Sequence, residues 1–236
     1  MSLIKLPLIA IDAFNMLLNA TPPNPPQPLS EHLIPDWRER FLRSLALPSR
    51  VIRSLYWSAG LIEVLIILAS HIPTSPVAHP ILSVLFFNGS SPQKICVSWA
   101  FILGFTLTLI GTYIRLNSFR TLGRLFTFEL CIRKDHRLIV DGPYALVRHP
   151  SYTGLILNII GACVNHVSGS WARESGALDT TLGRTIALLW MLGAGAVVLS
   201  LVLRVPKEDE ILRKRFGNEW VEWAERVPYK FVPGVY

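Results

Sequence analysis

The sequence predicts an all-α, polytopic helical membrane protein. Three observations predict it: the chain is unusually apolar, its apolar residues gather in long blocks, and its basic residues fall mostly between those blocks. Hydrophobic residues make up 51% of the 236 positions and charged residues 17%, and the mean hydropathy is +0.41. Soluble domains carry about 25% charged residues. The composition therefore favours one compact helical membrane domain over one or two soluble domains.

Five segments are long and apolar enough to cross a bilayer as helices, which takes about 17 to 25 residues. The first could instead be a cleaved signal peptide, because Lys5 precedes an apolar stretch and Ala20 ends a sequence that resembles a cleavage site. Asp12 and Asn15 interrupt that stretch, so both readings stay open. The five segments cover residues 3–20, 51–70, 95–116, 152–168 and 182–203.

The basic residues predict how these segments are oriented, because cytoplasmic loops retain Lys and Arg. Basic residues are frequent in the first loop, in the third loop and in the C-terminal tail. The loop over 71–94 holds only Lys94, and the loop over 169–181 holds only Arg173. This alternation predicts five spans, with the N-terminus in the lumen and the C-terminus in the cytosol.

The remaining composition points to lipid as a partner and away from nucleic acid and metal. The net charge is +7, yet Lys and Arg form no arm or stripe with interleaved aromatics, so anionic lipid headgroups are favoured over nucleic acid. Cys96, Cys131 and Cys163 show no disulfide or metal-binding spacing, and we expect buried, inert thiols. The Pro-rich stretch 21–28 is expected to be an extended linker, or alternatively a polyproline recognition ligand.

A dense group of turn-forming, aromatic, cationic and imidazole side chains precedes the fourth apolar segment. Asp141-Gly142-Pro143 is a turn signal, and Pro150 is well tolerated in the first turn of a helix. We therefore expect the helix to begin there, with His149 at its entry. Each residue taken alone has an ordinary structural interpretation, such as an interfacial anchor or a topology signal. Their concentration favours a functional site at the cytosolic mouth of this helix.

Two glycines inside the fourth segment predict a close helix contact. Gly154 and Gly161 lie seven residues apart and therefore share one helical face. A face without side chains lets a neighbouring helix or a ligand approach the backbone closely.

A second group of charged residues follows the last apolar segment. Arg204 and Glu208 share a helix face if the helix continues past Pro206 or only kinks there. Gly217 is placed to end that helix. The structural alternative is a solvated amphipathic helix with ordinary charge pairs.

The C-terminal tail contains an amphipathic repeat. Trp220, Trp223, Ala224 and Val227 recur at helical spacing, which predicts a helix lying on the membrane surface. We assign these tryptophans no chemistry.

With these motifs in place, the chain resembles the isoprenylcysteine carboxyl methyltransferases and the broader group that includes phospholipid methyltransferases. The resemblance is strong over about the last 110 residues, while the N-terminal half matches only as hydrophobic spans. The motifs that carry it are Gly142-Pro143-Tyr144, Arg148-His149-Pro150-Ser151-Tyr152-Thr153-Gly154, Glu208-Asp209, Phe216-Gly217 and Val227-Pro228.

The resemblance implies an S-adenosylmethionine site at the cytosolic ends of the last helices. Arg204 matches the family arginine implicated at the substrate and is the expected catalytic residue. Two positions depart from the family pattern: Asp209 replaces a Glu, and Glu129 stands where the animal enzymes have Gln. The residues implied as cofactor contacts are His136, Leu138, Ile139, Tyr144, His149, Pro150, Ser151, Tyr152 and Glu208.

The expected domain division follows from the same resemblance. Residues 1–120 would form N-terminal transmembrane helices around the Pro-rich linker, and residues 121–236 a methyltransferase region with two spans and an amphipathic tail. The expected location is the endoplasmic reticulum membrane, with the active site facing the cytosol.

The expected reaction is methylation of the C-terminal α-carboxylate of a prenylated cysteine in proteins with CaaX-type ends. This carboxylate is already ionised at neutral pH, since its unperturbed pKa is about 3.3 to 3.7, so no general base is needed. Three alternatives remain at this stage. A phospholipid N-methyltransferase of the phosphatidylethanolamine type would need a base or a lowered amine pKa. A sterol reductase would be a longer chain that uses NADPH, and a noncatalytic membrane adaptor would bind through the Pro-rich linker.

Overall fold

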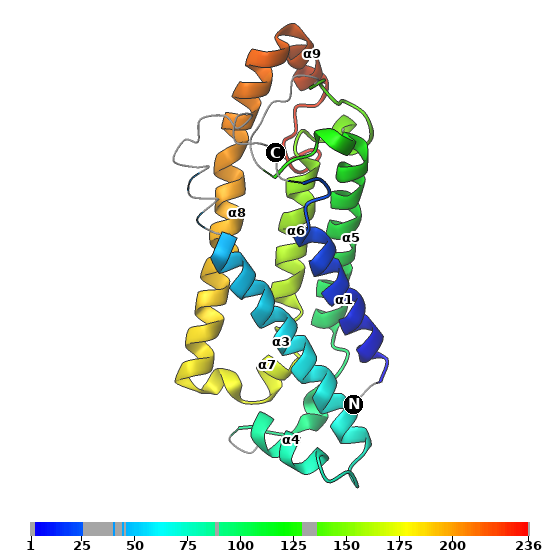
Figure 1. The fold of residues 1–236 in the computed structure, drawn as a ribbon, viewed down its shortest axis with the longest axis vertical. Helices are drawn as coiled ribbons and strands as arrows, with labels where there is room; N and C mark the ends of the chain where they lie inside the picture. Colours follow the sequence, from blue (N-terminus) through cyan, green and yellow to red (C-terminus); the bar gives the residue numbers. More distant parts are fainter. Residues whose placement is uncertain are drawn as a thin grey trace. The chain divides into compact units, whose positions relative to one another are not determined.

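The computed structural model describes residues 3–25, 40, 44, 46–87, 90–128 and 136–235, and every regular element in these ranges is helical (Figure 1). The all-α prediction is confirmed for this part of the chain. The α-helices are α1 (Lys5–Ala20), α3 (Ala46–His71), α4 (Ala78–Leu85), α5 (Trp99–Leu122), α6 (Pro150–Val164), α7 (Trp171–Glu174), α8 (Thr181–Phe216) and α9 (Asn218–Arg226). The short 3-10 turns are η2 (Pro92–Lys94), η3 (Gly123–Leu125), η4 (Gly142–Ala145) and η5 (Ala177–Asp179).

Each of the five predicted spans coincides with a helix. Within the described ranges, three helical stretches are long and apolar enough to cross a membrane: Arg50–His71, Trp99–Leu125 and Thr181–Phe216. The other two are shorter, because α1 has 16 residues and α6 has 15. A bilayer needs about 17 to 25 helical residues, so the five-span count stays a prediction.

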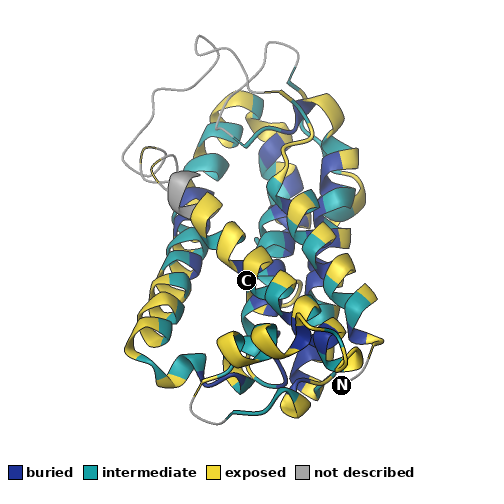
Figure 2. Cartoon of the chain, turned by 60° about the horizontal axis from the view of Figure 1, so that its bottom comes forward, coloured by how far each residue is buried: buried dark blue, intermediate teal, exposed yellow. Residues whose placement is uncertain are grey.

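Large apolar side chains remain exposed along the long helices, and exposed residues recur over much of their length (Figure 2). Leu61 of α3, Ile102 of α5 and Leu189 of α8 are 61%, 54% and 62% exposed. Apolar surface of this extent marks a surface that something apolar covers, and around helices of spanning length that cover is lipid. The chain is an integral membrane protein.

The chain forms two compact units, and their boundaries fall inside α1, α3, α5, α6 and α8. Unit 1 comprises Met1–Leu17, Pro48–Leu109 and Asn158–Gly195. Unit 2 comprises Leu18–Leu47, Ile110–Leu157 and Ala196–Tyr236.

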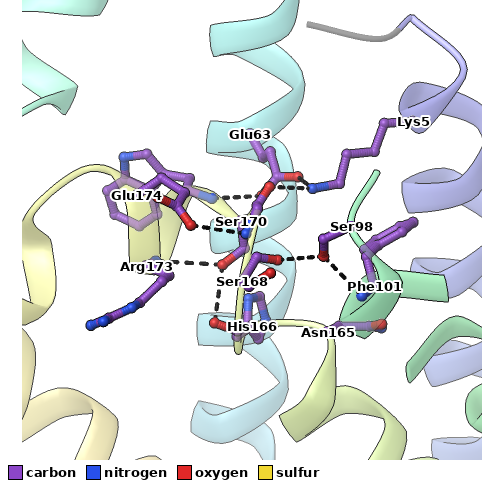
Figure 3. Close-up of polar contacts among 12 residues, drawn as sticks. Lys5, Glu63, Ser98, Phe101, Asn165, His166, Ser168, Ser170, Arg173 and Glu174 are labelled. Carbon is purple, nitrogen blue, oxygen red and sulfur yellow. Dashed lines mark hydrogen bonds and ion pairs between the residues drawn. The ribbon is translucent and has the colours of Figure 1, made fainter. Parts of the chain in front are cut away.

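Unit 1 holds a buried ion pair between α1 and α3 (Figure 3). Lys5 Nζ lies 2.5 Å from Glu63 Oε1, and the two side chains are 1% and 6% exposed. Lys5 also donates to the carbonyl of Gly169 at 2.6 Å, while Glu63 accepts from the Trp171 backbone N–H at 2.8 Å. Because both charges are hydrogen-bonded as well as paired, this contact fixes α1 against α3 and the 169–171 segment.

A second buried network in unit 1 surrounds Asp12 of α1. Its carboxylate accepts hydrogen bonds from Tyr56 of α3, Thr108 of α5 and Asn165, which follows α6. Asp12, one of the polar residues that interrupt the first apolar segment, thus points toward protein partners.

Glycines bring α5 and α6 into close contact in both units, as predicted. A Cβ at Gly161 would lie 2.6 Å from the Gly104 carbonyl oxygen within unit 1. A Cβ at Gly154 would lie 2.6 Å from the Gly111 carbonyl oxygen within unit 2. Real Cβ atoms do not approach carbonyl oxygens so closely, so glycine is required at these positions.

The core of unit 2 corrects one prediction. Trp220 and Trp223 of α9 are 8% and 3% exposed, and they form a buried cluster with Tyr144 and Val227. Trp223 Nε1 donates to the Tyr144 carbonyl oxygen at 3.1 Å. The apolar face of α9 therefore packs on protein, and the predicted membrane-surface packing of these tryptophans is wrong. Helical spacing reveals an apolar face but not what covers it.

Candidate active site

The entry to α6 is built as the sequence predicts, and the C-terminal tail holds it in place. The helix begins at Pro150, and His149 precedes it. The backbone N–H groups of Arg148 and His149 donate to the carbonyl oxygens of Tyr229 and Lys230, each at 2.9 Å. These bonds satisfy donors at the start of the helix, where no intrahelical partner exists.

Two consecutive carboxylates of α8 meet the α6 entry within unit 2. Tyr152 donates its hydroxyl to Glu208 Oε2 at 2.6 Å. His149 Nε2 lies 3.0 Å from Asp209 Oδ1. The rings of His149 and Tyr152 are stacked, with centroids 5.5 Å apart and an interplanar angle of 11°. The structure thus joins two motifs that are about 60 residues apart in the sequence.

Arg204 lies beside the same carboxylate. The helix α8 continues through Pro206, so Arg204 and Glu208 share a face as expected, with Nε to Oε2 at 3.7 Å. Arg204 is 7% exposed, and its Nη1 donates to the Phe128 carbonyl oxygen at 2.8 Å. This places a buried cation next to a carboxylate that is 26% exposed.

Tyr144 lies in η4, after the predicted turn, where Gly142 has a φ of 58°. Burial raises the pKa of the Tyr144 phenol well above its ordinary value, and the nearby charge of Glu208 acts in the same direction. The phenol therefore stays neutral and remains a hydrogen-bond donor at physiological pH.

Four other predicted contacts, His136, Leu138, Ile139 and Pro150, lie in the packed interior of unit 2 or against it. Leu138 and Ile139 pack against the tryptophan cluster of unit 2, and the ring of His136 lies 5.9 Å from that of Phe216. Pro150 is fully buried.

Ser151 faces a different partner from the other predicted contacts. Its hydroxyl and carbonyl oxygens accept from Arg115 Nη1 at 2.9 and 3.1 Å. Among the described residues, Ser151 forms no hydrogen bond with Glu208 or Arg204. Glu129 lies outside the residues that the structure describes.

Sequence reasoning missed the part played by Arg148 and Asp209. Arg148 Nη1 lies 3.1 Å from Asp209 Oδ2, and its Nη2 donates to the Pro228 carbonyl oxygen at 3.2 Å. Arg148 also lies over the Trp220 ring, at 5.7 Å from its centroid. The motif containing Arg148 and the Asp209 position were both visible in the sequence, but the sequence does not show that these two residues form an ion pair.

This arrangement can bind a polar ligand at one end of apolar helices. It offers a buried guanidinium, carboxylates held by hydrogen bonds, and aromatic faces from His149 and Tyr152. Such a set can orient charged groups and stack a planar ring.

Comparison with known proteins decides the family. The model of the isoprenylcysteine carboxyl methyltransferase family matches residues 102–169, which include His149 and Tyr152. The chain is 30% identical over 156 residues to protein-S-isoprenylcysteine O-methyltransferase B of Arabidopsis thaliana, covering 64% of this chain and 67% of that protein. The chain belongs to the isoprenylcysteine carboxyl methyltransferase family. Membership makes it a methyltransferase in class and implies a methyl donor.

Two further relatives show how far the similarity reaches. The protein-S-isoprenylcysteine O-methyltransferase of Saccharomyces cerevisiae is 35% identical over 143 residues, which are 60% of this chain and 51% of that protein. The chain thus spans about half to two thirds of the length of these methyltransferase relatives. A Delta(14)-sterol reductase of Mus musculus is 27% identical over 100 residues, but these are only 20% of its length. The sterol reductase match is therefore a small part of that protein, whereas the two methyltransferase matches cover 64% and 60% of this chain.

Proposed function

We propose that this protein transfers a methyl group from S-adenosylmethionine to the C-terminal α-carboxylate of a prenylated cysteine. The observation that carries the proposal is the convergence of His149 and Tyr152 with Arg204 and Glu208 in a chain of this family. The curated relatives that bear the name protein-S-isoprenylcysteine O-methyltransferase support the choice of substrate.

The polar groups present fit the amino-acid portion of S-adenosylmethionine. Glu208 is partly exposed and can accept from an ammonium or from ribose hydroxyls. Two buried donors, Arg148 Nε and Trp220 Nε1, have no hydrogen-bond partner among the described residues. Buried donors are normally satisfied, so a ligand carboxylate or a water is the expected acceptor. The family contacts proposed for this chain are His136, Leu138, Ile139, Tyr144, His149, Pro150, Ser151, Tyr152 and Glu208.

The chemistry requires alignment more than proton transfer. S-adenosylmethionine, when bound, supplies a methyl group that its sulfonium cation has already activated. The substrate carboxylate is ionised at neutral pH, so none of the titratable side chains at the site has to act as a base. Arg204 is proposed to hold and orient that carboxylate, because a guanidinium can bind both oxygens at once. Correct alignment of reacting groups can supply ~7 to 11 kcal/mol of a barrier.

The membrane would deliver the substrate. A farnesyl or geranylgeranyl chain is apolar and enters from the bilayer, while the cofactor comes from water. The long apolar helices and the polar site at residues 136–152 and 204–209 support a meeting point at the membrane interface. We place this interface on the cytosolic side of the endoplasmic reticulum, with residues 121–236 as the methyltransferase region.

Purified protein supplied with methyl-labelled S-adenosylmethionine tests the proposal. We expect label on N-acetyl-S-farnesylcysteine, released by base as an ester would be, and no label on phosphatidylethanolamine. Label on the lipid amine alone would replace this function with phospholipid N-methylation. Absence of cofactor binding to folded protein would point to a noncatalytic adaptor.

A further inference from the structure

The carboxylate of Asp209 joins two consecutive residues at the α6 entry, using one oxygen for each. Oδ1 lies 3.0 Å from His149 Nε2, and Oδ2 lies 3.1 Å from Arg148 Nη1. The Asp209 side chain is 12% exposed and that of His149 is 4% exposed. A carboxylate held from both sides in this way has one orientation, and it imposes one on the imidazole.

The orientation of His149 matters for its neighbours. Its ring is stacked on Tyr152, whose hydroxyl donates to Glu208. Its backbone N–H is bound to the Lys230 carbonyl oxygen at 2.9 Å. Because the His149 backbone is held in place, the contact with Asp209 determines the rotation of the imidazole ring. The position of the Tyr152 ring stacked on it depends on that rotation.

Glu208 and Asp209 divide the work between them. Glu208 contacts Tyr152 and Arg204, whereas Asp209 contacts His149 and Arg148. Successive helical residues point about 100° apart, so Glu208 and Asp209 contact different residues at the α6 entry. Only Glu208 also borders the cation proposed to hold the substrate.

We propose that Asp209 is a positioning residue that orients His149, and through it Tyr152, without touching cofactor or substrate. The inference rests on the proposed function, in which His149 and Tyr152 contact S-adenosylmethionine. Partners that orient histidine ligands at metal sites typically cost ~10- to 100-fold in affinity when removed. For Asp209→Asn we expect about a tenfold loss of cofactor affinity by the same reasoning.

The main experiment compares Asp209→Asn, Asp209→Glu and the matched control Glu210→Gln in the full chain. Glu210 is an exposed neighbour that pairs only with Lys207 and Lys214 in the described structure. Calorimetry should give weaker S-adenosylmethionine binding for Asp209→Asn, near-normal binding for Asp209→Glu, and no change for the control. In turnover, KM for the cofactor should rise while kcat at saturation is kept. Equal affinities for Asp209→Asn and the control would overturn the proposal.

A double-mutant cycle tests whether Asp209 acts through His149. Added to His149→Ala, the Asp209→Asn change should have little further effect on affinity, because the residue it orients is gone. Full additivity of the two losses would contradict the positioning role.

A third measurement does not depend on the cofactor. Diethyl pyrocarbonate acylates accessible imidazoles, and peptide mass spectrometry reports the modified fraction at His149. The reaction should speed up in Asp209→Asn and not in Glu210→Gln, and an unchanged rate would overturn the inference. If the wild-type chain bound no S-adenosylmethionine but this acceleration were seen, the proposed function would fail while the Asp209 contact stood. Asp209→Ser, which lets water replace the carboxylate, is the second variant should Asp209→Asn not fold.

Discussion

Arg204 combines deep burial with a loose charge pair. Its Nη1 is fixed by the Phe128 carbonyl oxygen at 2.8 Å, whereas its Nε lies 3.7 Å from Glu208, beyond hydrogen-bonding distance. The carbonyl contact sets the plane of the guanidinium. In the proposed mechanism, the substrate carboxylate would take the place of this long contact with Glu208.

We expect Arg204→Ala to lower methyl transfer by roughly two to three orders of magnitude. Removing one partner from a buried ionic contact costs ~3 to 5 kcal/mol, and ~1.4 kcal/mol corresponds to one decade in rate. Cofactor affinity should change little, since the proposed contacts of Arg204 are to substrate. Arg204→Lys keeps the positive charge but cannot bind both carboxylate oxygens in the planar geometry of a guanidinium. Its rate of methyl transfer should lie between those of the unmodified enzyme and Arg204→Ala. An Arg204→Ala enzyme of normal rate would remove this residue from the mechanism.

Cofactor affinity should depend on Glu208 and His149 more than on neighbouring charges of α8. Glu208→Ala and His149→Ala are each expected to weaken S-adenosylmethionine binding, because both residues lie in the polar contacts that join α6 to α8. Glu210→Ala and Arg213→Ala are the controls, since the ion pairs of Glu210 in the described structure are with Lys207 and Lys214, and Arg213 is exposed. Calorimetry on folded protein provides the comparison. Identical affinities across all four variants would reject the assignment.

Single residues were predictable here where a local pattern identified them. The turn before Pro150 and the spacing of Arg204 and Glu208 are local features, and the structure confirms both. The bridge from Asp209 to Arg148 was not predictable, because it joins positions about 60 residues apart. Such pairings depend on tertiary packing, which one sequence does not reveal.

At the scale of elements, α1 is held by charge as well as by apolar packing. Lys5 and Asp12 would be costly in a helix surrounded by lipid, but both are paired with partners in unit 1. Loss of α1 would leave Glu63 buried without its cation. We therefore expect α1 to remain in the folded protein. This favours the interpretation of residues 3–20 as a retained helix over that of a cleaved signal peptide.

Lys5→Met should destabilise the protein strongly, because Glu63 would be left as a buried charge with no cation (Figure 3). The expected loss is ~3 to 5 kcal/mol. Combining it with Glu63→Gln should recover much of this loss, since the amide oxygen can still accept from Trp171. Lys94→Met, at an exposed site, is the matched control. Thermal unfolding in detergent compares these three variants with the unmodified protein, and a Lys5→Met variant as stable as Lys94→Met would contradict the pairing.

The contact between α5 and α6 is equally specific. Gly161→Ala would place a methyl group 2.6 Å from the Gly104 carbonyl oxygen and 2.9 Å from the Thr108 backbone nitrogen. Overpacking of this kind typically costs ~1 to 3 kcal/mol. Gly195→Ala on α8 meets nothing within 4 Å and should be neutral or slightly stabilising. Equal unfolding temperatures for Gly161→Ala and Gly195→Ala would show that α5 and α6 are not in close backbone contact at Gly161.

Whole-molecule features were predictable to different degrees. Composition and block length predicted an all-helical membrane protein, and within the described ranges three helices meet the length and hydropathy of a span. Which face of α9 is buried was not predictable, because apolar spacing is the same whether lipid or Tyr144 covers it. The orientation of the chain still rests on its basic loops.

Cysteine labelling in sealed vesicles tests that orientation. Single cysteines replacing Asp141 and Lys207 should react with an impermeant reagent added on the cytosolic side, because both positions border basic segments expected there. A cysteine replacing Arg173 should react only from the lumen. Labelling of Asp141 and Lys207 positions from the lumen instead would reverse the topology and close the cytosolic route for the cofactor.

Under the proposed function, the glycine contacts between α5 and α6 would also restrict how a prenylated substrate reaches the site. At Gly104, Gly161 and Gly154, an added Cβ would lie 2.6 Å from a carbonyl oxygen of the facing helix, so there is no room for a methyl group. An isoprenyl chain is far wider than a methyl group and has no passage between these two helices at either contact. Under the proposed function, a prenyl chain entering from the bilayer would therefore have to reach the site elsewhere than through these two contacts. A crosslink across α5 and α6 should accordingly leave turnover of farnesylated substrates unimpeded.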